Sequence, residues 1–269
     1  LALTRARELF QLLERRAHDP KHGGYHEWFR RDWTLILDPA EPSFVGAAGR
    51  KTFNTHLHLL EAFAALHRAW PDPLLRERLH ELVVILTSTI PRHSHGASVD
   101  AFTPDWRPIL EPRNLRASYG HDIEAVWLAL DAADAIGLPR APLRNWAETL
   151  AANCLANGHD AEHGGFYEGG PLGKPADALN KTWWVQNEAA VGLLELFRLT
   201  GDPKYYAAFE KTLRFQLDHQ IAGEGGWWAT RAADGSPTRD TTRTGPWQGG
   251  YHAGRALLLC ADWLEAMAQ

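Results

Sequence analysis

The chain of 269 residues is 45% hydrophobic and carries a formal net charge of −5. This length allows one or two domains with a real core, and the acidic balance argues against nucleic acid or an anionic membrane as a partner, because no basic face is implied. No apolar stretch approaches the length of a membrane span, and the two cysteines, Cys154 and Cys260, lie far apart in predicted helices. Without a disulfide framework, we expect a reducing, cytoplasmic compartment.

Eight helices are predicted in chain order, from apolar residues spaced i, i+3 and i+4 and from the turn residues between them. They cover residues 4–17, 52–70, 73–90, 119–136, 142–157, 182–200, 203–219 and 250–267. Turn residues separate the helices of a pair at Pro71-Asp72-Pro73, Gly137-Leu138-Pro139 and Gly201-Asp202-Pro203. Short strands are expected only where glycine pairs meet aromatic residues, at 23–25, 164–167 and 225–228.

A motif recurs every 63 or 64 residues at the start of every second helix, which is the mark of a repeat architecture. Its copies are His58-Leu59-Leu60-Glu61, His121-Asp122-Ile123-Glu124, Val185-Gln186-Asn187-Glu188 and Gly249-Gly250-Tyr251-His252. Two helices and a long loop per repeat predict helical hairpins, arranged either as an open superhelix or as a ring, the (α/α)6 barrel. In a ring, the polar residues of the motif would converge on one pocket.

The eight predicted helices are too few for six hairpins. We therefore expect one all-α domain over residues 1–269, a barrel-type toroid of helical hairpins that lacks its N-terminal third. The chain also opens at Leu1 inside a helical pattern, without an initiator methionine or a signal segment, so we expect residues to precede Leu1 in the gene product.

The motif copies contain side chains suited to acid–base chemistry. His121 and Glu124 are neighbours on a helix, and a carboxylate beside an imidazole fixes the orientation of the ring. Asn54 and His58 share one helix face, and Glu61 lies one turn further. Taken singly, each motif also fits an ordinary helix cap with solvated or core-satisfied histidines; their common period favours a shared pocket.

Two adjacent tryptophans and a glycine-rich helix start complete this pocket. Because Trp183 and Trp184 are adjacent, we expect only one of them to face the core, and we expect Trp184 to form a wall on which a sugar stacks. His252 begins the last helix, where glycines allow a close approach of the backbone.

Imidazoles near neutrality suit the abstraction and return of a proton at carbon. No serine or cysteine is presented with an obvious base for nucleophilic catalysis, and no phosphate-cradling glycine loop of the P-loop or dinucleotide kind is present. Three histidines can bind a metal, but no two phased histidines are close in sequence, and we expect none. The pairs His18/His22 and His159/His163 have i, i+4 spacing but lie in loops outside the phase, where solvation is expected.

At these residues the chain resembles the N-acylglucosamine 2-epimerase superfamily, most closely its cellobiose 2-epimerase-like branch. The resemblance rests on Asn54-Thr55-His56-Leu57-His58, Tyr119-Gly120-His121-Asp122-Ile123-Glu124, Trp183-Trp184-Val185-Gln186 with Glu188, and Trp247 followed by Tyr251-His252 and Arg255. It implies an (α/α)6 barrel with an axial sugar site and no metal or redox cofactor. The implied reaction is epimerisation at C2 of a reducing-end glucose or mannose unit, or aldose–ketose isomerisation.

The same resemblance implies roles for single residues. His121 and His252 would be the acid–base pair that flanks C2 and works through a cis-enediolate, with Glu124 orienting His121. His58 would assist ring opening. The substrate would be bound by Asn54, Trp184, Trp247, Glu188 and Arg255.

One departure from the branch concerns specificity. Its members typically carry Cys-Pro and Asn where this chain has Gly249-Gly250 and Ala253, which leaves a monosaccharide isomerase open. Two other classes of function also remain: an α/α-barrel glycoside hydrolase using Glu61, Glu124 or Glu188, and a non-catalytic sugar-binding module. In each case we expect a small-molecule sugar as the partner and a monomer or homodimer.

Overall fold

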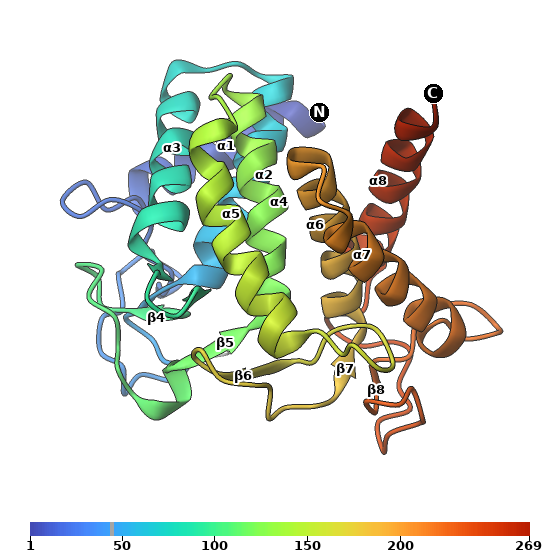
Figure 1. Cartoon of the computed structure of the whole chain (residues 1–269). Coiled ribbons are helices and arrows are strands. Elements are labelled where there is room, and N and C mark those ends of the chain that lie inside the picture. The colour runs from blue at the N-terminus through green and yellow to red at the C-terminus, as the bar shows by residue number, and fades with distance from the viewer. Residues whose placement is uncertain (44–45) are drawn as a thin grey trace. The chain divides into compact units, whose positions relative to one another are not determined.

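The computed structural model describes residues 1–43 and 46–269, and in these residues it contains eight α-helices (Figure 1). They are α1 (Ala2–Arg16), α2 (Phe53–Ala69), α3 (Pro73–Val84), α4 (Tyr119–Ala135), α5 (Ala141–Asn153), α6 (Trp183–Thr200), α7 (Pro203–Phe215) and α8 (Gly250–Ala268). Each predicted range overlaps one of these helices. The predicted all-α class is therefore confirmed.

Three of the helices continue into a single π-helical turn. These turns are Ile85–Thr89 after α3, Cys154–Gly158 after α5 and Gln216–Gln220 after α7. The sequence-based ranges for these helices extend into the π turns, because apolar spacing does not distinguish a π turn from an α turn. A short 3-10 helix, Pro112–Asn114, precedes α4.

Strands in the described residues are two or three residues long. They are β1 (Lys51–Thr52), β2 (Pro91–Arg92), β3 (Ala97–Ser98), β4 (Ala101–Phe102), β5 (Arg116–Ser118), β6 (Gly169–Pro171), β7 (Lys181–Thr182) and β8 (Thr230–Arg231). Antiparallel pairs form between β1 and β4, β5 and β6, and β7 and β8. The strands expected at the glycine pairs are instead isolated bridges, His18 with Tyr25, His159 with Phe166, and Ile221 with Trp227.

The turns between paired helices explain where α3 and α7 begin. Asp72 and Asp202 accept hydrogen bonds from backbone N–H groups of the first turn of α3 and α7, at 2.9–3.1 Å. A proline follows each aspartate at the first helical position, where its missing N–H costs nothing. Gly201, in the left-handed conformation at φ 72°, ends α6.

Contacts divide the described residues into two compact units, which we describe separately. The first unit contains Leu1–Arg92, Ser98–Leu115 and Leu128–Leu143; the second contains His93–Ala97, Arg116–Trp127 and Arg144–Gln269. In the first unit α2 packs against α1 and α3. In the second, α6 is buried over most of its length and packs against α7 and α8 (Figure 1). The predicted single domain over residues 1–269 stays a prediction.

Each unit contains a buried lysine that ties a glycine-containing loop to a helix start. In the first unit the Lys51 ammonium donates to Asp19 Oδ2 at 2.8 Å and to the Gly23 carbonyl at 2.6 Å. In the second, Lys181 does the same with Asp160 and Gly164 at the same two distances. Both lysines are fully buried. We call these two arrangements the lysine clamps.

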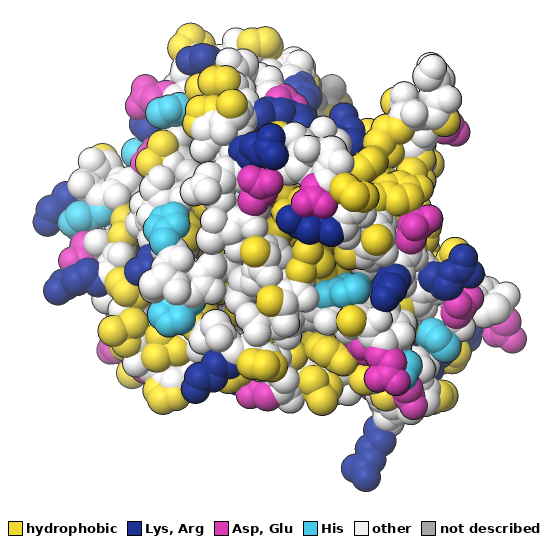
Figure 2. All heavy atoms as spheres, viewed as in Figure 1, with side chains coloured by type: hydrophobic (Ala, Val, Ile, Leu, Met, Phe, Trp, Pro, Cys, Tyr) yellow, Lys and Arg dark blue, Asp and Glu magenta, His cyan; other side chains and the backbone are white. Residues whose placement is uncertain are grey.

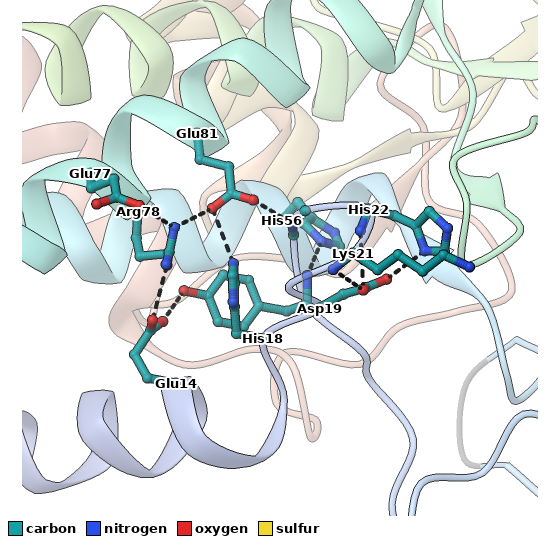
Figure 3. A network of polar contacts seen from close by, with 12 residues as sticks. Glu14, His18, Asp19, Lys21, His22, His56, Glu77, Arg78 and Glu81 are labelled. Atoms are coloured by element: carbon teal, nitrogen blue, oxygen red, sulfur yellow. Dashed lines mark hydrogen bonds and ion pairs between the residues drawn. The ribbon is translucent and has the colours of Figure 1, made fainter.

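The first unit extends its clamp into a network of polar contacts (Figure 3). His22 lies 3.2 Å from Asp19, and His18 Nε2 lies 3.2 Å from Glu81, which also pairs with Arg78. The His18 side chain is only 11% exposed. The expectation that His18 is a solvated loop residue is therefore wrong, because the loop folds back onto α3 and pairs this imidazole with a carboxylate.

Helix α8 carries an exposed apolar face, visible along this helix in Figure 2. Leu258 is 69% exposed, and Tyr251 and Leu257 are each 41% exposed.

Within the described part of the chain, no helix combines the length and the apolar character needed to cross a membrane.

Candidate active site

Counted from the helix start, α2, α4, α6 and α8 all carry an ionisable residue at one position, and α4 and α8 carry a histidine at another. Their sixth residues are His58, Glu124, Glu188 and Arg255, and their third residues are Thr55, His121, Val185 and His252. The structure therefore aligns His58 with the glutamates and Arg255, and the predicted alignment of His58 with His121 is wrong. The error is three residues, close to one helical turn, so the side chains stay on one helix face.

In the second unit one indole lies against both candidate acid–base residues. The Trp184 ring centroid is 4.8 Å from that of His121 and 5.6 Å from that of His252. Both imidazoles are partly exposed, on the first turns of α4 and α8. The predicted grouping of His121, Trp184 and His252 is thus present in this unit.

Glu188, the sixth residue of α6, contacts both His252 and Arg255, the third and sixth residues of α8. Its carboxylate is fully buried; Oε1 lies 2.6 Å from His252 Nδ1 and accepts from Arg255 Nη2 at 2.7 Å. Its other oxygen accepts from Trp127 Nε1 at 3.0 Å. Glu188, predicted as a substrate ligand, therefore holds the ring of His252.

A second buried carboxylate shares the same arginine. Glu124 is fully buried, and its Oε1 accepts from Arg255 Nη2 at 3.1 Å. The guanidinium carbon lies 4.7 Å from the Trp127 ring centroid and 4.2 Å from the Tyr251 ring centroid. The predicted role of Glu124 in orienting His121 stays a prediction.

Sequence reasoning assigned no role to Trp127, which resembles an ordinary member of an amphipathic run, or to Tyr251, which it named only as part of a motif. Trp127 is buried, and its polar edge faces a carboxylate rather than the core. Tyr251 lies 4.5 Å from the His252 ring between centroids. The spacing could have indicated Trp127 as a site residue, since it follows Glu124 by three residues and so lies on the same helix face.

A glycine allows Trp184 to lie close to α4. A Cβ atom built on Gly120 would lie 2.6 Å from both Cη2 and Cζ3 of the indole, which is a clash. The glycine at position 120 therefore allows the Trp184 indole to lie beside His121.

We expect Gly120→Ala to destabilise the protein by about 1–3 kcal/mol, because the indole must move within a packed site. Gly254→Ala is the matched control: a Cβ atom there meets nothing within 4 Å, so it should stabilise α8 by about 0.5–1 kcal/mol. Urea unfolding midpoints measure both changes. Equal effects of the two substitutions would contradict this account of Gly120.

His58 and Asn54 belong to the first unit and are described within it. His58 Nδ1 lies 3.4 Å from Glu61 Oε2, and the Asn54 backbone N–H donates to Asp100 at 3.0 Å. Their predicted meeting with His121 and His252 stays a prediction. Trp247 is 63% exposed before the start of α8, and its predicted stacking on a sugar also stays a prediction.

The neighbouring His56 is a structural residue. It is fully buried; its Nε2 accepts from the Tyr25 N–H at 2.9 Å, and Nδ1 lies 2.7 Å from the Thr52 carbonyl. Burial lowers the pKa of His56 to about 4, which keeps the ring neutral. Gln186, at the same position of α6, likewise accepts from a loop N–H, that of Phe166, and donates to the carbonyl four residues before it, that of Thr182; it also donates to the Phe166 carbonyl.

Three side chains of the site have the geometry of a metal site. Glu124, Glu188 and His252 offer ligand atoms within 4.8 Å of one another. The cation that these carboxylates contact in the structure is the Arg255 guanidinium. An ion would have to displace Arg255 from both carboxylates, so the donor set fits an internal salt bridge better than a metal.

Neither cysteine has the character of a nucleophile. Both are free and buried, and burial beside Glu188 raises the pKa of Cys260 to about 12. Burial also raises the pKa of Cys154. Both thiols are therefore protonated at neutral pH.

Comparison with known proteins gives a consistent result. Residues 2–256 match the profile of the family described as N-acylglucosamine 2-epimerase (GlcNAc 2-epimerase). Cellobiose 2-epimerase of Bacteroides fragilis is 34% identical over 265 residues, which are 96% of this chain and 64% of that protein. A cellobiose 2-epimerase of Ruminococcus albus is 30% identical with the same coverage. The chain thus spans about two thirds of the length of these relatives.

Solved structures agree. Cellobiose 2-epimerase from Spirochaeta thermophila matches the whole chain and 66% of its own length, with a TM-score of 0.86 and 32% identity. A D-mannose isomerase shares the fold, with a TM-score of 0.81 and 21% identity. These matches confirm the predicted fold class, the helical-hairpin fold of the epimerase (α/α)6 barrels. From the profile, the relatives and the fold together, the chain belongs to the N-acylglucosamine 2-epimerase family.

Proposed function

We propose that this chain carries the acid–base residues of a cofactor-independent sugar 2-epimerase. The observation that supports this most directly is that two imidazoles, His121 and His252, lie against one indole, Trp184. An indole is a platform for the apolar face of a sugar, and two imidazoles beside it provide a base and an acid for one carbon atom.

In this mechanism one histidine removes the proton from C2 of the ring-opened aldose. The C–H electron pair forms the C1=C2 bond of a cis-enediolate, and the negative charge moves to the oxygen on C1. The other histidine then returns a proton to the opposite face of C2, which restores the C1 carbonyl and inverts C2. Glu188 holds His252 during both steps, because its buried carboxylate lies 2.6 Å from the Nδ1 atom of that ring.

The substrate class follows from the relatives, which are named cellobiose 2-epimerases. We assign to this chain a reducing-end glucose or mannose unit, free or linked to a second sugar. A cytoplasmic location, suited to such a metabolic enzyme, is part of the same proposal.

The buried carboxylates argue against a glycoside hydrolase. Such an enzyme needs two carboxyl groups that reach opposite sides of the scissile bond. Glu124 and Glu188 are both fully buried, and both accept from the same nitrogen of Arg255. They serve better as partners of Arg255, with Glu188 also holding His252, than as a hydrolytic pair.

Deuterium exchange tests the proposal. The protein as its gene encodes it is incubated in D2O with glucose, mannose or cellobiose, and the products are followed by NMR. We expect deuterium at C2 of the epimer in at least one case. Deuterium at C1 of a ketose would indicate aldose–ketose isomerisation instead, and no exchange with any aldose would contradict both reactions.

A further inference from the structure

The guanidinium of Arg255 is enclosed by the protein. Its two aromatic neighbours, Trp127 and Tyr251, lie 4.7 and 4.2 Å from the guanidinium carbon. Its Nη2 donates to Glu124 at 3.1 Å and to Glu188 at 2.7 Å, and the side chain is 16% exposed. An arginine held in this way is a poor ligand for a substrate, because binding would have to compete with contacts it already makes.

Two fully buried carboxylates near one another repel, and removing both of them from water carries a desolvation cost. A guanidinium that donates to both removes this penalty, because it supplies a permanent positive charge at hydrogen-bond distance from each. Arg255 thus allows Glu188 to stay ionised without contact with solvent.

The charge of Glu188 determines which nitrogen of His252 carries the proton. An ionised carboxylate can only accept a hydrogen bond, so at 2.6 Å the His252 Nδ1 must be the donor. When the ring is neutral, Nε2 then carries the lone pair. The atom that can act as a base is thereby chosen by Glu188, and Glu188 in turn depends on Arg255.

We propose that Arg255 is a positioning residue, an internal counter-ion that keeps Glu188 ionised and so holds His252 in the Nδ1–H form with Nε2 free to exchange protons. This assignment replaces the substrate-binding role that the family resemblance implies for Arg255. Its catalytic consequence rests on the proposed epimerase function, whereas its consequence for the His252 ring does not.

The test uses Arg255→Met, with ¹⁵N-histidine labelling and long-range ¹H–¹⁵N NMR to read the tautomer of His252, whose signals are identified by their loss in His252→Gln. We expect the wild-type ring in the Nδ1–H form and a loss of that form in Arg255→Met. In turnover we expect kcat to fall by about 10–100-fold, as for other groups that orient a functional imidazole, with KM changed by less than about threefold.

Two further variants keep the test decisive if Arg255→Met folds poorly. Arg255→Lys retains the positive charge and should retain the Nδ1–H form, and the double variant Arg255→Met/Glu124→Gln should fold but lose it. Arg243→Met is the matched control: Arg243 also lies over an indole, 5.3 Å from the Trp228 centroid, but it pairs with an exposed Glu224. It should change neither readout.

The proposal is overturned if Arg255→Met leaves the His252 tautomer intact, or if it raises KM in proportion to the loss of kcat/KM while kcat is unchanged. Should the wild-type protein turn over no sugar, the NMR result alone decides. Loss of the Nδ1–H form would then support the positioning role although the epimerase proposal had failed.

Discussion

Replacing His252 with glutamine is expected to lower the rate of C2 epimerisation by about 10²–10⁴-fold, the range typical of losing a positioned acid or base. Glutamine retains a hydrogen-bonding group near Glu188 but cannot accept and return a proton at neutral pH. The same loss is expected for His121→Gln, because inversion at C2 needs a group on each face of the enediolate. Initial rates with glucose, mannose and cellobiose, measured by NMR, give both values.

The two variants should differ in a way that a structural defect would not produce. Each retains one base, so each should still exchange the C2 hydrogen of one epimer with D2O while failing to invert it. His121→Gln and His252→Gln are expected to retain exchange with opposite members of the glucose–mannose pair. If both variants exchanged the C2 hydrogen of the same epimer, the two histidines could not each act on a different face of C2.

His219→Gln is the control for both substitutions. His219 also lies against an aromatic ring in the second unit, 5.2 Å from the Phe215 centroid, but in the π turn after α7. It should keep at least half of the wild-type rate. A comparable loss in His219→Gln would mean that any lost imidazole in this unit impairs folding.

Replacing Lys181 with methionine is expected to cost about 3–5 kcal/mol of unfolding free energy, because it leaves a buried carboxylate without its counter-ion. Lys181 is fully buried and Asp160 is 4% exposed. The Lys181 ammonium also donates to the Gly164 and Ala233 carbonyls, each at 2.6 Å, so three groups lose their donor together. Urea unfolding, followed by tryptophan fluorescence, measures the loss.

Lys204→Met provides the comparison, since Lys204 and Asp202 form a pair at 2.8 Å on the protein surface. Water screens such a pair, and its removal should leave the urea midpoint nearly unchanged. A midpoint for Lys181→Met that equals that of Lys204→Met would show that the buried clamp contributes no stability.

The same clamp predicts how stability changes in acid. Burial by itself would raise the pKa of Asp160, but hydrogen bonds from Lys181 and from the His163 N–H hold that pKa well below its usual range. The folded protein therefore binds this proton less readily than the unfolded chain does. The contribution is fully present above the unfolded pKa of about 4, and it is lost as the pH falls through and below that value. In Lys181→Met, we expect the free energy of unfolding to fall less steeply as the pH is lowered through this range, as measured by urea unfolding at a series of pH values.

The hairpins of this fold could be predicted because their signals are local. Asp72-Pro73 and Asp202-Pro203 cap helices through their own backbone neighbours, and apolar spacing of three and four residues is visible in any helix. The grouping of His121, Trp184 and His252 was predicted from the common period of the motif copies and from the family resemblance; the helix starts of the structure place all three in first helical turns.

The register between repeats could not be predicted from this pattern, because residues three apart share a helix face. His58 was aligned with His121, whereas the helix starts align it with Glu124, Glu188 and Arg255. The Lys-Thr pairs at 51–52 and 181–182, which precede α2 and α6, are the sequence signal that would have corrected it.

The sequence by itself determined the helices, their pairing and the set of side chains able to exchange protons, because these depend on spacing along the chain. Only the tertiary structure decided which carboxylate serves which imidazole. Glu188 lies on α6 and supports a histidine of α8, together with an indole of α4 and the Arg255 guanidinium. Hydrogen bonds of this kind join residues more than sixty positions apart, and they depend on how the helices pack rather than on any local pattern.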